Sequence, residues 1–268
     1  MMSQSVLHDW RDPVLPRSLA LWLLSTSAPA PLSAGTLIGR AAIFGIEPAA
    51  VRVALGRLVR EGMARQPERG VYALGSAAAA LHAKARSWML VEASVRPWAG
   101  AWMLVLTHHL GRTDRSRLQR RERALRLTGF AHAGAGTWVR ADNLRRSVAE
   151  LRNELGGLGL EGEAPLLTGC IAEPAPDRSY RALWPVDALE QGYRHWLGEM
   201  AASAARVEHM ATRDAARETY LLGQSVLRAI NSDPLLPAEL IDVDLRGRMV
   251  EAMKRYNAMA LGHWSSIA

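Results

Sequence analysis

The chain has 268 residues, 49% of them hydrophobic, yet no apolar run approaches the roughly 20 residues that cross a bilayer as a helix. One cysteine, Cys170, excludes a disulfide within this sequence and a zinc site built on several thiolates. Lysine and arginine exceed aspartate and glutamate by 33 to 26, and the excess is almost all arginine. A formal charge of +7 favours polyanionic partners such as nucleic acid, although an arginine-rich proteome would give the same excess.

The length suits two domains or three small ones, and the sequence has no internal repeat. We expect three distinct domains, over residues 1–92, 93–176 and 177–268. The opening residues include Asp9 and Asp12 and lack the basic start and apolar centre of a secretory signal. A cytoplasmic protein without a membrane partner is therefore expected.

Three helices are predicted in the first segment. The first carries the leucines of residues 19–24 and is ended by the prolines of STSAPAPLS. The second runs from about Ser33 to Phe44 and stops at Gly45. The third opens at Pro48 and is amphipathic, with an inner face made of Val51, Leu55, Leu58 and Val59.

The tight turn between the second and third helices is the geometry of a helix-turn-helix. After Gly62, the stretches Met63–Arg65 and Val71–Leu74 predict two strands around a loop through Pro67 and Gly70. A hairpin that follows a recognition helix is a wing, so residues 1–92 are predicted to form a winged helix-turn-helix domain. Similar helix pairs also occur in proteins that never bind DNA.

The outer face of the third helix favours double-stranded DNA as its partner. It combines small residues with arginines and has no acid, whereas a solvated helix face normally mixes both signs. Small residues would let the helix enter the major groove while the arginines reach base edges or phosphates. The predicted DNA-binding residues are Ala49, Arg52, Val53, Gly56, Arg57 and Arg60 on the helix, with Arg65 and Arg69 on the wing.

In the middle segment, strands are predicted to alternate with helices, which suggests a ferredoxin-like α+β unit. Trp102–Leu106 reads as a buried strand, and a basic helix follows from about Asp114 to Thr128, with Leu118, Ala124 and Leu125 facing inward. FAHAGAGTWVR predicts two short strands around a glycine-rich turn. A helix over roughly Asn143–Leu155, a flexible turn at GGLGLEGE and a strand in APLLTGCIA complete the segment.

The last segment is predicted to be entirely helical, so the whole chain is α+β and mostly helical. Asp187 and Glu190 have the spacing of a capping box, and Thr212 can cap the next helix. SDPLLPAEL is a connector interrupted by prolines, and a terminal helix follows Asp244.

Several sequence strings, spread over all three segments, resemble the PaaX family of transcriptional repressors. They are AVRVALGRLVREGM (50–63), PWAGAW (97–102), LTGF (127–130), GTWVR (136–140), LW (183–184) and DPLLPAEL (233–240). The resemblance implies a cytoplasmic homodimer that represses an operon of aromatic-compound catabolism. It implies release from the operator by an aryl-acyl-CoA thioester such as phenylacetyl-CoA, and a middle domain similar to a ferredoxin-like nuclease of CRISPR adaptation.

The chain departs from the family pattern in two places. Its wing is short, with Arg65 and Arg69 as the only cations. Just before DPLLP, many relatives have a histidine, an aromatic and a basic residue, where this chain has Gln224, Val226 and Leu227. These departures leave the effector open between an aryl-CoA thioester and an aromatic acid.

The residues give little support to an enzyme. His108 and His109 cannot face the same side of a strand, and no HExxH motif occurs. A nuclease of the related fold would need a metal-binding aspartate where this chain has Thr107. GGLGLEGE lacks the lysine of a phosphate-binding loop. We therefore expect no enzyme, no metal, no cofactor and no catalytic residue. The alternative is an acyl-CoA-binding or nucleic-acid-processing enzyme on the same fold.

The basic helix of the middle segment is compatible with three roles. Its arginines could contact DNA phosphates, cradle the phosphates of coenzyme A, or form a solvated face. The candidate ligand-binding residues are Arg115, Arg117, Arg120 and Arg121 of this helix, together with Trp184 and Trp196 of the last segment.

Overall fold

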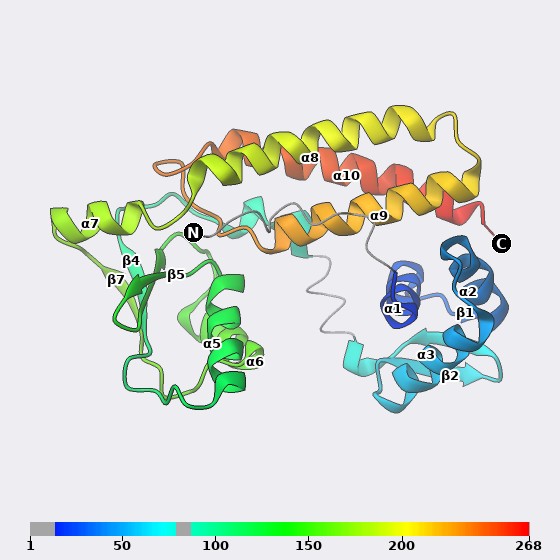
Figure 1. Ribbon diagram of the computed structural model, residues 1–268, viewed down its shortest axis with the longest axis horizontal. Helices are drawn as coiled ribbons and strands as arrows, with labels where there is room; N and C mark the ends of the chain where they lie inside the picture. Colours follow the sequence, from blue (N-terminus) through cyan, green and yellow to red (C-terminus); the bar gives the residue numbers. More distant parts are fainter. Residues whose placement is uncertain (1–13, 79–86, 268) are drawn as a thin grey trace. The chain divides into compact units, whose positions relative to one another are not determined.

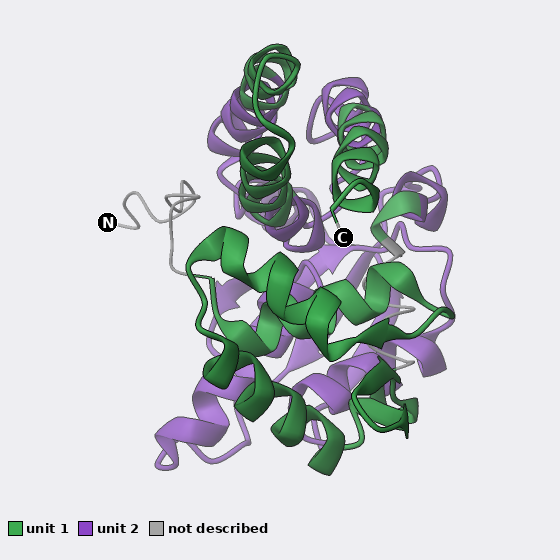
Figure 2. Ribbon diagram, turned by 90° about the vertical axis from the view of Figure 1, so that its right-hand side faces the viewer, with its two compact units in different colours: residues 1–89, 198–226, 252–268 green, residues 90–197, 227–251 purple. Residues whose placement is uncertain are grey.

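The computed structural model describes residues 14–78 and 87–267, and it confirms the predicted α+β class (Figure 1). Asp9, Asp12 and residues 79–86 of the predicted first domain lie outside the described residues. The chain divides into two compact units, which Figure 2 shows in two colours. Unit 1 comprises residues 1–89, 198–226 and 252–268, and unit 2 comprises residues 90–197 and 227–251. The three consecutive domains inferred from the sequence stay a prediction. Among the described residues, no helix is long and apolar enough to cross a membrane.

Unit 1 begins with three helices where the sequence predicted them. The hydroxyl of Ser33 caps the second helix by accepting a hydrogen bond from the backbone N–H of Thr36 (3.0 Å). Gly45 has a φ of 69°, a left-handed conformation that glycine adopts easily, and it ends the turn after the second helix. The elements are α1 (Pro16–Ser27), α2 (Ala34–Ala41), the 3-10 turn η1 (Ala42–Phe44) and α3 (Pro48–Arg60).

A three-stranded antiparallel sheet completes this part of unit 1. It consists of β1 (Leu32–Ser33), β2 (Ala64–Glu68) and β3 (Val71–Leu74) in the order β1-β3-β2. The prediction of a loop through Pro67 was wrong, because β2 continues to Glu68. Proline is tolerated there because β2 is an edge strand and its register shifts between Arg65 and Glu68. The two-residue strand β1 was not predicted.

The hydrophobic core of unit 1 joins the beginning and the end of the sequence. Leucines of α1, α2 and α3 pack with buried residues of α9 (Thr212–Asn231) and α10 (Val243–Ser265). Trp22 of α1 makes edge-to-face contacts with Tyr220 (ring centroids 4.8 Å apart) and Trp264 (5.2 Å). Aromatic side chains bury about 150–250 Å² each, so this cluster contributes several kcal/mol to holding the N-terminal helices against residues of α9 and α10.

Unit 2 contains a four-stranded antiparallel sheet with the order β5-β6-β4-β7. Helices α5 and α6 cover one face, and Met103 and Val105 of β4 share a core with buried residues of both helices. The other face carries Trp102, which packs against Trp98 and Trp184. The elements are β4 (Trp102–Leu106), α5 (Arg115–Leu127), β5 (Ala131–Gly134), β6 (Thr137–Ala141), α6 (Val148–Leu158) and β7 (Leu166–Cys170), preceded by the 3-10 turns η2 (Ser87–Leu90) and η3 (Glu92–Ser94).

Two details of the sequence prediction around α6 need correction. Helix α6 begins at Val148, not near Asn143, because Ser147 and Glu150 form a capping box. The first glycines of GGLGLEGE belong to α6, and the turn begins at Gly159, whose φ is 112°.

The capping box predicted for Asp187 and Glu190 is also wrong, since helix α8 (Val186–Val207) already begins before Asp187. The Glu190 carboxylate instead accepts a hydrogen bond from the backbone N–H of Asp242 (3.1 Å) and pairs with Arg194 (3.0 Å). A further helix, α7 (Pro174–Arg181), precedes α8.

Candidate functional site

The outer face of α3 carries the first candidate site. The helix buries Val51, Leu55 and Leu58 in the core of unit 1, and the opposite side faces solvent. All eight residues predicted to bind DNA are exposed, six on α3 and two on the β2–β3 hairpin that follows it. They are Ala49, Arg52, Val53, Gly56, Arg57, Arg60, Arg65 and Arg69.

The arginines of this face have almost no partners within the chain. Arg60 donates to the carbonyl of Gly56 (3.4 Å). The neighbouring carboxylate of Glu61 is paired with Arg17 (2.6 Å). Within residues 14–78 and 87–267, no carboxylate forms an ion pair with the other four arginines of the face, which are Arg52, Arg57, Arg65 and Arg69. Their positive charge is therefore available to a partner.

Gly56 lies in the middle of this face, and the packing of the helix does not require a glycine there. A methyl group at this position would meet no atom within 4 Å, so the fold has room for a side chain. Glycine inside a helix costs about 1 kcal/mol relative to alanine. Val53, one turn earlier, leaves 56% of its surface exposed. The exposed face of α3 therefore has Gly56 and Val53 in its middle and arginines around them.

The basic helix α5 differs from its prediction at one decisive position. Arg121 was predicted as a ligand-binding residue, but it is only 3% exposed and belongs to the buried side of the helix. Its guanidinium binds both carboxylate oxygens of Glu161 (2.9 and 2.6 Å) and the carbonyl of Gly111 (3.1 Å). These hydrogen bonds lower the pKa of the Glu161 carboxyl and raise that of Arg121. Arg121 is therefore a structural cation.

The other candidate ligand residues are not gathered in one place. Arg117 lies 3.8 Å from Glu161, and Arg120 donates to the hydroxyl of Ser116 (2.9 Å), whereas Arg115 is exposed.

The two tryptophans of the candidate set are buried. Trp184 stacks on Trp102 (ring centroids 6.2 Å apart), and Trp196 contacts His195 (4.8 Å).

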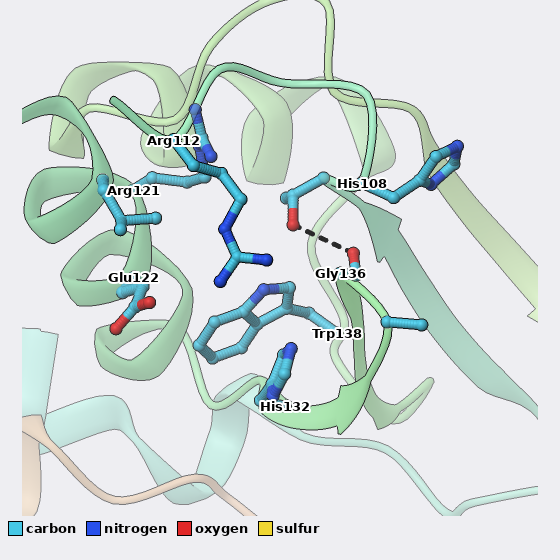
Figure 3. Close-up of a pocket in the computed structure, with 10 residues that line it drawn as sticks. His108, Arg112, Arg121, Glu122, His132, Gly136 and Trp138 are labelled. Atoms are coloured by element: carbon cyan, nitrogen blue, oxygen red, sulfur yellow. Dashed lines mark hydrogen bonds between the residues drawn. The ribbon is translucent and has the colours of Figure 1, made fainter. Parts of the chain in front are cut away.

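A pocket of about 340 Å³ opens beside α5, and of the six candidate ligand residues Arg121 alone lines it. In Figure 3, the side chain of Arg112 reaches into the pocket toward the indole of Trp138, with His132 beside it. The hydroxyl of Thr107 donates to the carbonyl of Gly136 (2.9 Å) at the rim. The lining residues are Thr107, His108, Arg112, Leu118, Arg121, Glu122, His132, Ala135, Gly136 and Trp138.

Sequence reasoning did not single out Arg112, His132 or Trp138, because they come from a loop and two strands that only the sheet brings together. His108 lines the pocket, and His109 contacts both its ring (ring centroids 5.2 Å apart) and the carbonyl of Glu163 (3.2 Å). Both histidines lie in the turn after β4, which ends at Leu106, so the prediction that they face opposite sides of a strand does not apply to them.

A second feature without a sequence signal is a buried polar network around the connector of residues 233–236. Arg246 binds both oxygens of Glu92 (3.0 and 3.2 Å) and the carbonyl of Leu236 (2.9 Å). Asp233 accepts hydrogen bonds from the hydroxyl of Tyr193 (2.5 Å) and the backbone N–H of Leu235 (2.7 Å).

The same network continues to the sheet. The amide of Asn143 donates to the carbonyl of Leu235 (2.7 Å), and Arg140 of β6 donates to Asn143 (3.3 Å) and to the carbonyls of Thr128 and Ala141. Burial lowers the pKa of Arg140.

Comparison with known proteins supports the resemblance seen in the sequence. Residues 184–264 match the family described as PaaX-like protein C-terminal domain. The chain has a PaaX-like C-terminal domain. The matched range includes the DPLLPAEL connector, and the recognition of a PaaX-like protein is confirmed.

Two further comparisons concern the whole chain. The structure is similar to that of the uncharacterized protein Rv0674 from Mycobacterium tuberculosis, with a TM-score of 0.68 and 24% sequence identity. The likeness covers 94% of this chain and 98% of the other, and it shows a shared fold. No curated protein matches the chain.

The contribution of the Arg121–Glu161 ion pair to stability can be tested by measuring the free energy of unfolding as a function of pH. The pKa of Glu161 is lowered in the folded state, so its contribution to stability is present above the unfolded value of about 4.3 and is lost as the pH falls through the folded value. We expect Glu161→Gln to reduce the free energy of unfolding at pH 7 by about 3 kcal/mol, because a buried guanidinium loses its counter-charge. Urea denaturation between pH 3 and 7 should then show less acid destabilisation than in the wild type.

Glu163→Gln is the matched control, because Glu163 lies two residues away and is exposed. It should leave both the stability at pH 7 and the acid dependence close to those of the wild type. Equal acid profiles for the wild type and Glu161→Gln would contradict a stabilising role of the pair.

Proposed function

We propose that the protein is a DNA-binding transcriptional repressor of the PaaX type and not an enzyme. In this proposal it acts as a cytoplasmic homodimer on an operon of aromatic-compound catabolism. The observation that carries it is the outer face of α3, where unpaired arginines surround Gly56 and Val53. The PaaX-like C-terminal domain supports the same class of protein.

The order of elements in unit 1 supports a winged helix-turn-helix. Helices α2 and α3 are joined by the short segment around Gly45, and the β2–β3 hairpin follows α3 directly. In this motif the second helix enters the major groove, and the hairpin reaches the adjacent backbone. In unit 2, the order β4-α5-β5-β6-α6-β7 with the sheet β5-β6-β4-β7 supports a ferredoxin-like domain.

The chemistry of each exposed residue suggests its role on DNA. Arg52 and Arg57 present forked donors that match guanine edges or phosphates. Ala49 and Gly56 keep the helix surface low, so that it can approach the base pairs closely. Val53 offers an apolar contact of the kind that thymine methyl groups accept. Two further arginines, Arg65 and Arg69, would contact phosphates from the hairpin.

Replacing Arg57 by alanine tests the electrostatic part of the proposal. We expect Arg57→Ala to weaken binding to a duplex selected from a random pool by about 1–3 kcal/mol if the side chain contacts a base, and to relax preference at that base pair. Fluorescence anisotropy with the full chain measures the affinity. Wild-type affinity should fall steeply with salt, with about −0.9 in the log-log slope for each phosphate contact.

Arg123→Ala serves as the control, since it removes one exposed arginine from α5 and keeps the net charge of the two variants equal. It should bind DNA as the wild type does. If the two variants lose affinity equally, net charge alone explains binding, and α3 has no special role.

Replacing Gly56 by leucine tests the shape of the face without changing its charge. Leucine favours helix more than glycine, so Gly56→Leu should raise the free energy of unfolding by up to about 1 kcal/mol. The same substitution should weaken DNA binding at least about tenfold, because the new side chain prevents close approach to the base pairs.

Gly157→Leu provides the comparison, because Gly157 is also an exposed helical glycine with no neighbour within 4 Å of its Cβ position. This substitution should affect stability but not DNA binding. Unchanged affinity in Gly56→Leu would show that the face stays clear of the DNA.

We further propose an aryl-CoA thioester as the effector, a proposal that rests on the family resemblance. The ligand must bind the DNA-incompetent state better, and a tenfold loss of DNA affinity requires about 1.4 kcal/mol of coupling. Calorimetric titration of phenylacetyl-CoA should show tighter binding without DNA than with it, by the same factor. Phenylacetic acid is the comparison: equal release of DNA by the acid at equal concentration would contradict a thioester effector.

A further inference from the structure

The pocket beside α5 contains one cation whose charge is not matched. Arg121 is neutralised by Glu161, and Glu122 is paired with Arg126 (3.2 Å). For Arg112, the described part of the chain supplies neither a hydrogen-bond acceptor nor a carboxylate. The lining therefore carries one uncompensated positive charge, on a side chain that reaches into the pocket (Figure 3).

Part of the remaining lining is apolar. Leu118 and the indole of Trp138 supply carbon surface, and Ala135 lies at the turn between β5 and β6. His132 lies against Trp138 with ring centroids 5.0 Å apart. Apolar surface beside polar groups that can orient a ligand is typical of small-molecule sites.

The rim of the pocket is held in place by the fold. The backbone N–H of Thr107 donates to the carbonyl of Gly136 (2.7 Å), and its hydroxyl donates to the same oxygen. At Gly136, with a φ of 72°, a methyl group would lie 2.6 Å from the backbone nitrogen of His108, so no side chain fits. On the other side, Arg121 fixes the carbonyl of Gly111, the residue before Arg112. A preorganised rim reduces the entropic cost of binding.

We infer that this pocket binds a small organic carboxylate, whose oxygens accept the forked N–H groups of Arg112 and whose apolar part lies against Leu118 and Trp138. Guanidinium groups bind carboxylates through two parallel hydrogen bonds. The single unmatched charge fits a monoanion better than a phosphate, which carries up to two charges at neutral pH. The inference goes beyond the proposed function, because it concerns the four-stranded sheet and holds whether or not α3 binds DNA.

Benzoate is a suitable probe because it combines one carboxylate with a flat apolar ring. Isothermal titration calorimetry with the full chain should detect benzoate binding, and benzamide, its uncharged analogue, should bind at least about tenfold more weakly. Arg112→Gln should weaken benzoate binding by at least about tenfold, which corresponds to about 1.4 kcal/mol. Inorganic phosphate should bind more weakly than benzoate.

Arg123→Gln is the matched variant, because Arg123 is an exposed arginine of α5 that does not line the pocket. It should bind benzoate as the wild type does. A melting temperature equal to that of the wild type shows that Arg112→Gln is folded. The inference is overturned if benzoate does not bind the wild type, if Arg112→Gln binds it equally well, or if phosphate or benzamide binds as tightly.

Discussion

Burial of arginine is the constraint on which unit 2 depends. The side chain of Arg246 is 2% exposed, and a guanidinium can leave water only if carboxylates and carbonyls accept its N–H groups. Glu92 and the carbonyl of Leu236 do so, and the connector between α9 and α10 must therefore follow a defined path. Leu235 adopts a φ of 54° on that path, a conformation that costs about 1–2 kcal/mol in a residue with a side chain. The hydrogen bonds of the network offset this cost.

The network also shows that the connector of residues 233–236 links several elements of unit 2. Asn143 and Arg140 tie the end of β6 to the carbonyl of Leu235, and Asp233 ties the same connector to Tyr193 of α8. Removing one member would leave buried polar groups unsatisfied, which costs more than the hydrogen bond itself contributes. The sheet and this part of the helical segment are thus held by polar groups as well as by apolar packing.

Local signals in the sequence were sufficient for most helices and strands. Ser33, Gly45 and Pro48 act within a few residues of their own positions, and they correctly predicted where α2 and α3 begin, although α2 ends at Ala41 and a 3-10 turn fills the rest of the predicted helix. The start of α6 was missed because a capping box at Ser147 competed with the apolar periodicity that begins earlier. The exposed face of α3 was predictable for a similar reason: helical geometry alone decides which residues lie opposite Val51 and Leu55.

Tertiary contacts could not be predicted in this way. The pairing of Arg121 with Glu161 crosses 40 residues, and the bond of Arg246 to Glu92 crosses 154. Helical spacing places Arg121 on the same face as Leu118, Ala124 and Leu125, but it does not indicate which carboxylate neutralises the buried guanidinium. The pocket of Arg112 and Trp138 likewise depends on how β4, β5 and β6 pair.

The structure therefore divides the arginines of this chain into two groups, those that are paired within the fold and those that are not. Arg121 and Arg246 are surrounded by acceptors, and their charges are neutralised within the fold. Arg52 and Arg57, like Arg112, have no carboxylate partner among the described residues. Folding therefore neither removes these guanidinium groups from water nor stabilises the chain through ion pairs with them. A general excess of arginine would scatter unpaired cations among acids over the whole surface. On α3 they instead surround a glycine that packing does not require, and that coincidence favours an anionic macromolecule as the partner of this face.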